Sequence, residues 1–295
     1  MLWLIQFVLP LALLLLLALR PARHSVTRTC QIAGTAAILL ALHLAGLWIL
    51  PPWWTPWVYW VLFALALWRG WGITNRTGFN AADAVIALFW AMVLGAGGWL
   101  ALDAYRGRTP PTGDMAELAL PLPRGQYLVA NGGSREIVNA HLRTLPRSTA
   151  GQRNYWGQSY AIDIIAIDRW GFPANGDSTI LSPCDGRVVR AEKEFADGLP
   201  VQLDSPTARA GNHALIRCGG FDILLAHFRQ GSLKFKAGDE VRTGQPVALL
   251  GNSGASDMPH LHIHAQRPGT DAAPFSGQPV PIRIDGRYLV RGDRP

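Results

Sequence analysis

Acidic residues are almost missing from the first hundred positions of this 295-residue chain. Asp83 is the one acid there, whereas Leu, Ala, Ile and Trp are abundant. The scarcity of acids together with this apolar content excludes an ordinary soluble domain and predicts a membrane region. The remainder has ordinary polarity, and its roughly 170 residues are enough to bury the core of one globular domain.

A strong basic balance is also missing. The net charge is +7, but residues 124–295 hold 20 Lys and Arg against 16 Asp and Glu. These charges are scattered, which is not the footprint of a nucleic-acid-binding surface. We therefore expect no nucleic-acid partner, and the balance favours an acidic polymer only weakly.

Cysteine is rare, and no CxxC pair occurs among the three cysteines. The missing spacing argues against a thiolate metal site, although a soft metal site at Cys184 and Cys218 is the alternative to a disulfide. Both residues fall in the predicted globular domain at ends of candidate strands beside turns, where pairing is geometrically feasible. If this domain lies outside the cytoplasm, we expect a disulfide between them.

Four apolar stretches predict four transmembrane helices. Each is close to the ~20 residues that a helix needs to cross the hydrocarbon core. They cover residues 2–19, 31–50, 53–68 and 82–102. The first has no Lys or Arg before its apolar run, so it lacks the charged start of a signal peptide and is expected to be retained. The predicted membrane domain covers residues 1–103.

Arginines in the loops predict the orientation of this domain. Arg20, Arg23 and Arg28 lie between the first two stretches, and Arg69 and Arg76 lie between the last two. Cytoplasmic loops are enriched in positive charge, so both chain termini are expected outside. The arginines at positions 106 and 108 argue against this orientation.

Two local features of the membrane region need an interpretation. His43 is an ionisable residue inside the second stretch, which could indicate a proton or haem site. No partner with ligand spacing exists in the other stretches, so helix packing is favoured. Asn80 or Asp83 is expected to cap the fourth helix.

Residues 104–124 contain four prolines and few apolar anchors, which predicts a semi-rigid tether. From residue 125 to residue 295, short apolar runs alternate with turn signals, and no long run has the helical period. This domain is therefore expected to be mostly antiparallel β, with a short helix near residues 134–142. Its candidate strands are residues 160–167, 186–191, 213–218, 223–228, 246–250 and 261–266.

Three histidines alternate along the last candidate strand. Residues two apart on a strand share one face, so His260, His262 and His264 point one way while Leu261 and Ile263 point into a core. Imidazole is the commonest protein ligand for zinc. The alternative is a polar strand face whose histidines are merely solvated.

Two more polar residues lie in apolar strands. An acid such as Asp163 is costly there unless it is paired or bound to a metal, and its alternative role is to cap a turn. His227, taken alone, is more typical of a satisfied core residue. Together with His260 and His262, the two residues make a histidine-and-carboxylate set that suits a catalytic zinc with open positions.

The order of these pieces resembles the lysostaphin-type zinc endopeptidases, also called the LytM family. The matching segments are residues 161–163, 182–188, 226–227, 238–241 with 244–245, 251–254 and 259–262. The Pro-His-Leu-His motif after a Gly-Asn turn is specific, whereas the 238–245 hairpin alone is weak. The resemblance implies a LytM (duplicated hybrid motif) fold for the β domain and does not extend to the membrane half.

The resemblance also implies a chemistry. Asp163 and His262 would bind zinc, while His227 and His260 would lie beside the metal, position the water and stabilise the oxyanion. The zinc would lower the pKa of its water towards ~7 and polarise the scissile carbonyl. The implied function is a zinc-dependent endopeptidase that cleaves peptide bonds in bacterial cell-wall peptidoglycan.

The same resemblance implies the partners and the location of the protein. The partners are the peptidoglycan peptide, membrane lipid, and wall-synthesis or wall-hydrolase proteins. The expected location is the bacterial inner (plasma) membrane, crossed several times, with the C-terminal domain in the periplasm or outside.

One family ligand is replaced in this sequence. The family has a His four residues before the Asp, and Ser159 occupies that position. Some relatives that have lost zinc ligands activate other wall hydrolases, so a degenerate domain that binds and activates such a hydrolase is the alternative to catalysis. A lipoyl-like carrier domain shares the 238–245 hairpin but would leave the histidines unexplained.

His141 is the predicted third zinc ligand. A catalytic zinc usually has three protein ligands plus water, and the hydroxyl of Ser159 is a poor one. His264 lies ~6.6 Å along the strand from His262, which is far for sharing one ion. The GG…N-x-H segment that ends at His141 resembles a branch of the family, and the polar stretch after it can fold back. The alternative is a loop histidine with only local hydrogen bonds.

Overall fold

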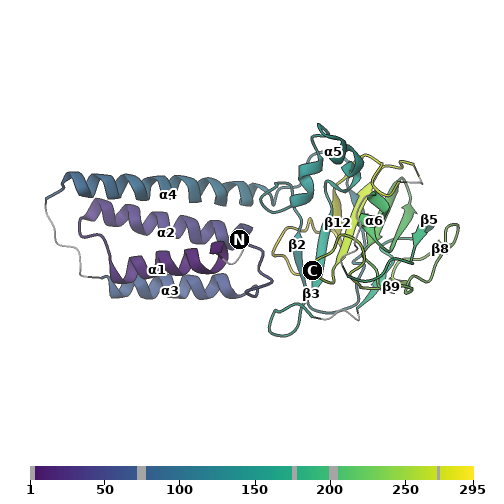
Figure 1. Cartoon of the computed structure of the whole chain (residues 1–295), viewed down its shortest axis with the longest axis horizontal. Helices are drawn as coiled ribbons and strands as arrows, with labels where there is room; N and C mark the ends of the chain where they lie inside the picture. The colour runs from purple at the N-terminus through teal and green to yellow at the C-terminus, as the bar shows by residue number, and fades with distance from the viewer. Residues whose placement is uncertain (1–3, 72–77, 175–177, 199–204, 271–272) are drawn as a thin grey trace. The chain divides into compact units, whose positions relative to one another are not determined.

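The computed structural model describes residues 4–71, 78–174, 178–198, 205–270 and 273–295. The chain divides into two compact units, Met1–Arg106 and Gly107–Pro295. Helices make up the described part of the first unit, and strands dominate the second (Figure 1).

The first unit contains four α-helices within the described residues. They are α1 (Leu9–Leu19, after the π-helical turn η1, Leu4–Val8), α2 (Ser25–Ala45), α3 (Thr55–Arg69) and α4 (Ala81–Arg106). Helix α2 packs against α4, and α1 packs against α3 (Figure 1). A Cβ on Gly97 would lie only 2.9 Å from the backbone of Ala37, so this glycine permits the close approach of α4 to α2.

Three side chains of this unit are placed as the sequence indicates. Asn80 and Asp83 cap α4 reciprocally: Asn80 Oδ1 accepts from Asp83 N at 2.9 Å, and Asp83 Oδ2 accepts from Asn80 N at 3.1 Å. His43 Nδ1 accepts a hydrogen bond from Trp60 Nε1 at 3.1 Å, which is a contact between helices α2 and α3. These contacts agree with a packing role for His43.

The prediction of four spans is supported only in part. Among the described residues, α2 and α4 are long and apolar enough to cross a membrane, judged by length and composition. Helices α1 and α3 have 11 and 15 residues. Helix α2 ends at Ala45 and not at residue 50 as expected, because Gly46 follows with an extended backbone (ψ 146°) and glycine favours the end of a helix.

An antiparallel sheet lies at the centre of the second unit, as predicted. Its strand order is β2-β3-β10-β7-β6-β5-β8, and β11 pairs with β10. The strands are β2 (Tyr127–Asn131), β3 (Ile162–Ala166), β5 (Gly186–Glu192), β6 (His213–Cys218), β7 (Phe221–Ala226), β8 (Glu240–Val241), β10 (Leu261–Gln266) and β11 (Pro279–Val280).

Two small sheets and four short helical turns complete this unit within the described residues. Strands β4 (Thr179–Leu181) and β9 (Pro246–Leu249) pair antiparallel, and β1 (Ala116–Leu118) and β12 (Ile282–Ile284) pair parallel. The helical turns are η2 (Ala140–Thr144), α5 (Ala150–Asn154), η3 (Trp156–Gln158) and α6 (Pro206–Ala210).

Two local expectations differ from the structure. Most of residues 134–142, expected to form a helix, are not helical, and only the end of that range enters η2. Strand β1 and the buried Leu118 and Leu122 lie in residues 104–124, so part of the expected tether belongs to the folded unit. Its partner β12 is distant in sequence, and composition alone does not reveal such a pairing.

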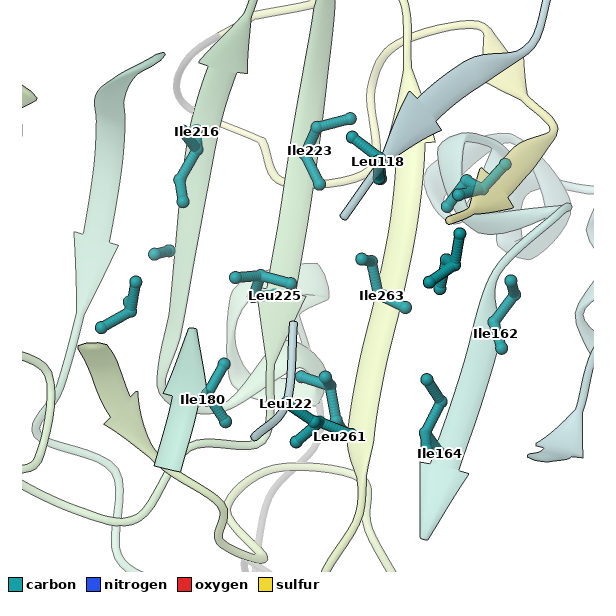
Figure 2. Close-up of a cluster of buried hydrophobic side chains, with 14 of the residues drawn as sticks. Leu118, Leu122, Ile162, Ile164, Ile180, Ile216, Ile223, Leu225, Leu261 and Ile263 are labelled. Carbon is teal, nitrogen blue, oxygen red and sulfur yellow. The ribbon is translucent and has the colours of Figure 1, made fainter. Parts of the chain in front are cut away.

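One face of the central sheet is covered by the main core (Figure 2). Ile162 and Ile164 of β3 and Leu261 and Ile263 of β10 lie on this face, and Leu118 of β1 is among the side chains that pack with them. Burial of each such side chain stabilises the fold by about 1.5–3 kcal/mol. Because strand side chains alternate, this burial directs the residues between them to the opposite face.

Candidate metal centre

The pairing of strand β10 brings distant polar residues together. Its register places His262 opposite Asp163 of β3 on one side and opposite Ala226 of β7 on the other. His227 directly follows the end of β7, so it lies near the same point of the sheet. The side chains of His262, Asp163 and His227 therefore lie close together on the face of the sheet opposite the main core.

His141, Asp163 and His262 form a compact group. The Nε2 atom of His141 lies 3.0 Å from Asp163 Oδ2, and His262 Nδ1 lies 3.0 Å from Asp163 Oδ1. One nitrogen or oxygen atom from each residue lies within 4.8 Å of the others. Two imidazoles and one carboxylate are a donor set that catalytic zinc sites use, with another position left for water. The residues present therefore fit a zinc ion.

The electrostatics of Asp163 favour metal binding. Burial would raise the pKa of this carboxyl, but the neighbouring His141, the hydrogen bond with His262 and the charge of His260 hold its pKa well below 3.8. Asn131 Nδ2 donates a further hydrogen bond of 2.8 Å to Asp163 Oδ2. The carboxylate is therefore ionised at neutral pH, which is the form that coordinates metals.

His262 is neutral at neutral pH. Burial lowers its pKa below 6.5, although the hydrogen bond with Asp163 opposes this effect. Its Nε2 lies 3.1 Å from Nδ1 of His264, whose ring stacks on Phe275. Because an ionised carboxylate only accepts, His262 Nδ1 donates the hydrogen bond to Asp163 Oδ1. With zinc at Nδ1, the neutral ring would carry its proton on Nε2 and donate it to His264 Nδ1.

His227 and His260 lie beside this group. Their ring centroids are 4.7 Å apart, and His227 is 5.7 Å from His262. His227 Nδ1 donates to Ser253 O at 2.8 Å, and His260 Nδ1 donates to Met258 O at 2.9 Å. A neutral imidazole with Nδ1–H has Nε2 free to accept a proton.

Two observations single out His227. Burial lowers its pKa well below 6.5, with the neighbouring His260 and His262 acting in the same direction, so its ring is neutral at neutral pH. Its φ angle is 65°, an uncommon backbone conformation for a residue other than glycine. The hydrogen bonds from His227 N to Ala210 O and from Phe228 N to Asn212 O fix this backbone. Such local strain is concentrated at functional sites.

Ser159 does not join the group in the described structure. Its buried hydroxyl donates to Trp156 O at 2.7 Å and lies 2.8 Å from Thr144 Oγ1. Thr144 in turn donates to His141 O at 2.8 Å. Ser159 therefore contacts the turn that carries His141, and the ring of His141 contacts Asp163.

Asn139 explains the position of His141 locally. Its Oδ1 accepts from His141 N at 3.2 Å, and its Nδ2 donates to Gly133 O and Ala161 O at 3.1 Å each. Sequence reasoning noted the segment that contains Asn139 but missed this role. It also missed Asn131, which donates to Asp163, and Arg291, which donates to Asn131.

The predicted disulfide residues and the further histidine His213 do not belong to the His141–Asp163–His262 group. Cys184 and Cys218 are disulfide-bonded with a Cα–Cα distance of 6.1 Å, and both pack against the main core. His213 is buried, and its Nδ1 donates to Gly211 O at 2.7 Å.

Residues 169–274 match the model of peptidase family M23. The match places part of the second unit, and not the helical unit, in similarity to this family. The matched segment includes His227, His260 and His262 of the site. His141 and Asp163 precede it, so the M23 segment and the residues before it both contribute to the site.

Several solved structures are similar to this chain at low identity. The catalytic domain of the prophage-encoded M23 protein EnpA from Enterococcus faecalis, a mutant form, is 23% identical with a TM-score of 0.30 over 41% of this chain and 73% of its own. A zinc-containing peptidase from Vibrio cholerae is 22% identical with a TM-score of 0.28, over 41% of this chain and 28% of that protein. Csd3 from Helicobacter pylori is 16% identical with a TM-score of 0.33, over 59% and 37%.

This chain therefore spans less than a third of the Vibrio cholerae peptidase, whereas it covers most of the EnpA domain. No curated protein matches the chain.

Proposed function

We propose that this protein is a zinc-dependent endopeptidase that cleaves peptide bonds in bacterial cell-wall peptidoglycan. The observation that carries the proposal is the group of His141, Asp163 and His262, with His227 and His260 beside it. Three donors around one point satisfy the ligand number of a catalytic zinc, and two further imidazoles, each bonded through Nδ1 to a backbone carbonyl, supply Nε2 as a proton acceptor.

His141, Asp163 and His262 would hold the zinc. When bound, zinc polarises the scissile carbonyl and lowers the pKa of a water molecule. His260 is fixed through Nδ1, and its Nε2 lies 3.7 Å from Asp163 Oδ1, on the side of the proposed ligands. This Nε2 is placed to take a proton from the attacking water and to return it to the nitrogen of the leaving amine.

His227 has a complementary role in this proposal. Its Nδ1–H is committed to Ser253 O, so its ring is fixed in orientation. The Nε2–H that His260 would carry after taking the proton of the water can donate to the negatively charged oxygen of the tetrahedral intermediate before the proton passes to the amine, and the fixed ring of His227 lies beside it. Hydrogen-bond donors at this oxygen are a major source of catalysis in acyl transfer.

The second candidate is a degenerate domain that binds and activates another wall hydrolase. Ser159 at the position of the usual His favours it, because the family ligand is lost. His141 opposes it, because His141 Nε2 supplies a third donor next to Asp163.

Metal analysis and activity of the purified full-length protein test the two candidates. We expect one zinc per chain and release of peptides from peptidoglycan. His262→Ala should lose the metal, whereas His260→Ala should keep most of it and lose turnover, because only His262 is assigned as a ligand. Equal metal loss in both variants contradicts these roles, and a metal-free wild-type protein favours the activator.

We further infer that the first unit anchors the protein in the bacterial inner membrane through four spans, with the second unit outside. Helices α2 and α4 support this by length and composition. Many large apolar side chains of the first unit are exposed, including Leu15, Trp68, Val85 and Trp99, as expected for a surface in contact with lipid.

A further inference from the structure

Arg291, close to the end of the chain, has its guanidinium inside the second unit. Its Nε donates to Ala130 O at 2.8 Å, and its Nη1 donates to Ile137 O at 2.9 Å. Ala130 lies in β2, and Ile137 lies near the far end of the loop that connects β2 to the turn of His141. The guanidinium therefore joins both ends of this loop, as a planar donor with fixed geometry can.

Asn131 connects Arg291 to the carboxylate of Asp163. Its Oδ1 accepts from Arg291 Nη2 at 2.9 Å and from Ala140 N at 3.3 Å, and its Nδ2 donates to Asp163 Oδ2 at 2.8 Å. A shift in the register of β2 and β3 between Val129 and Asn131 pairs Asn131 with Asp163. The two donors at Oδ1 fix the orientation of the amide. The NH2 group of Asn131 is therefore the end that faces the carboxylate of Asp163.

Arg291 remains charged in this environment. Burial lowers the pKa of its guanidinium from 12.5 to about 10, while the attraction of Asp163 opposes the decrease. A buried charge costs free energy unless it is well hydrogen-bonded. The guanidinium is thus a positive group near Asp163 at neutral pH.

The position of His141 makes such a connection necessary. A ligand at position 159 would precede Asp163 by four residues, so local chain geometry would fix their distance. His141 lies 22 residues before Asp163 on a separate turn, and its placement depends on contacts between segments. The bond of Asn131 to Ala140 ends directly before His141, and the bond of Arg291 to Ile137 ends four residues before it.

We propose that Arg291 and Asn131 are positioning residues of the metal site, an inference that rests on the proposed zinc function. Arg291 orients the amide of Asn131 and fixes the loop that leads to His141. Asn131 in turn orients the carboxylate of Asp163. Through these bonds, the two ligands that precede the M23 segment reach the distances at which they meet His262.

The test uses the full-length protein in detergent and measures zinc affinity by competition with a chelator. Arg291→Gln and Asn131→Leu should each weaken zinc binding about 10–100-fold, the range found when groups that orient metal ligands are removed. The absorption spectrum of the cobalt-substituted protein should change in both variants, because the spectrum reports ligand geometry. Arg291→Lys should not restore affinity, since one ammonium group cannot replace the planar fork of donors.

Arg287→Gln is the matched control, because Arg287 lies on the same C-terminal segment and is exposed. Its zinc affinity and cobalt spectrum should equal those of the wild type. The double variant Arg291→Gln/Asn131→Leu should lose no more affinity than the weaker-binding single variant, because both residues act through one connection.

The outcomes separate this inference from the proposed function. A wild-type protein without zinc contradicts the proposed function. A wild-type protein that binds zinc, together with Arg291 and Asn131 variants of unchanged affinity and spectrum, overturns only the positioning roles. A lower melting temperature with unchanged affinity also overturns them, since it shows a purely structural role. Arg291→Lys and Asn131→Leu keep the test valid if Arg291→Gln does not fold.

Discussion

At the scale of the residue, the site depends on which side chain replaces the missing ligand. The ring of His141 contacts Asp163, whereas the hydroxyl of Ser159 contacts Trp156 and Thr144. The two residues lie close together through Thr144, but only His141 directs a strong metal donor to the carboxylate.

Substitution of these two residues has opposite expected results. Ser159→Ala should keep zinc and activity, because the alanine removes no proposed ligand. His141→Ala should lose both, because two protein donors remain where three are needed. Metal analysis and a peptidoglycan release assay on both variants measure this. One zinc per chain and normal turnover in His141→Ala would show that the assignment is wrong.

His264 acts on the metal site through another residue in our interpretation. Its Nδ1 lies 3.1 Å from His262 Nε2, and it is not among the proposed ligands. His264→Ala should weaken zinc binding by about 10–100-fold, because the acceptor that fixes the ring of His262 is lost. His264→Gln should restore part of the affinity, since its amide oxygen can accept the same hydrogen bond. Chelator competition measures both, and unchanged affinity in His264→Ala contradicts the role.

At the scale of the element, strand pairing decides which face of the sheet carries the site. Leu261 and Ile263 of β10 lie in the main core, so His262 and His264 lie on the other face. Strand β6 behaves in the same way: Ala214 and Ile216 enter the core, and His213 is buried on the side of the site. Buried histidines on this face make the stability of the sheet sensitive to acid.

His213 gives a quantitative expectation for this acid sensitivity. Burial lowers its pKa from 6.5 to about 4. Below pH 6.5 the unfolded chain takes up a proton that the folded chain does not, so stability is fully present above pH 6.5 and decreases as the pH falls to about 4. At pH 5 this one residue should reduce the free energy of unfolding by about 2 kcal/mol relative to pH 7.5.

Calorimetry of the full-length protein at pH 7.5 and pH 5 measures this effect on the melting transition of the second unit. The matched variant His213→Gln cannot be protonated there, so the decrease between the two pH values should be smaller than in the wild type. An equal decrease in both proteins would show that His213 does not contribute.

At the scale of the whole molecule, the chain combines a helical unit with a β-rich unit that contains the segment matching peptidase family M23. A wall peptidase needs its site on the outer side of the membrane, where its substrate is. The loop arginines predict this orientation, because positively charged loops stay in the cytoplasm. The disulfide between Cys184 and Cys218 agrees with an oxidising compartment.

Reporter fusions test this orientation. A reporter that is active only outside the cytoplasm should be active when fused after Pro295 and inactive when fused near Arg23. Both positions use the same chain, so each serves as the control for the other. Activity only from the fusion near Arg23 would rule out a peptidoglycan-cleaving function for the second unit.

The local pattern of the sequence determined much of the second unit. The alternation of apolar and polar residues gives the bounds of β6 and β10 and assigns His262 and Leu261 to opposite faces, because a strand has a period of two residues. The motifs also indicated Asp163, His227 and His260 individually as candidate site residues. None of these inferences requires knowledge of which distant segments meet.

The resemblance predicts His141 as the third ligand, but only the tertiary structure decided which contacts place its ring beside Asp163. The ring of His141 reaches Asp163 through a turn fixed by Asn139, and Arg291 contacts Asn131 across 160 positions of sequence. The pairing of strand β1 with β12 likewise joins two segments that are far apart in the sequence. Such contacts depend on the packing of segments that are far apart in the chain, and a periodic pattern describes only neighbours along it.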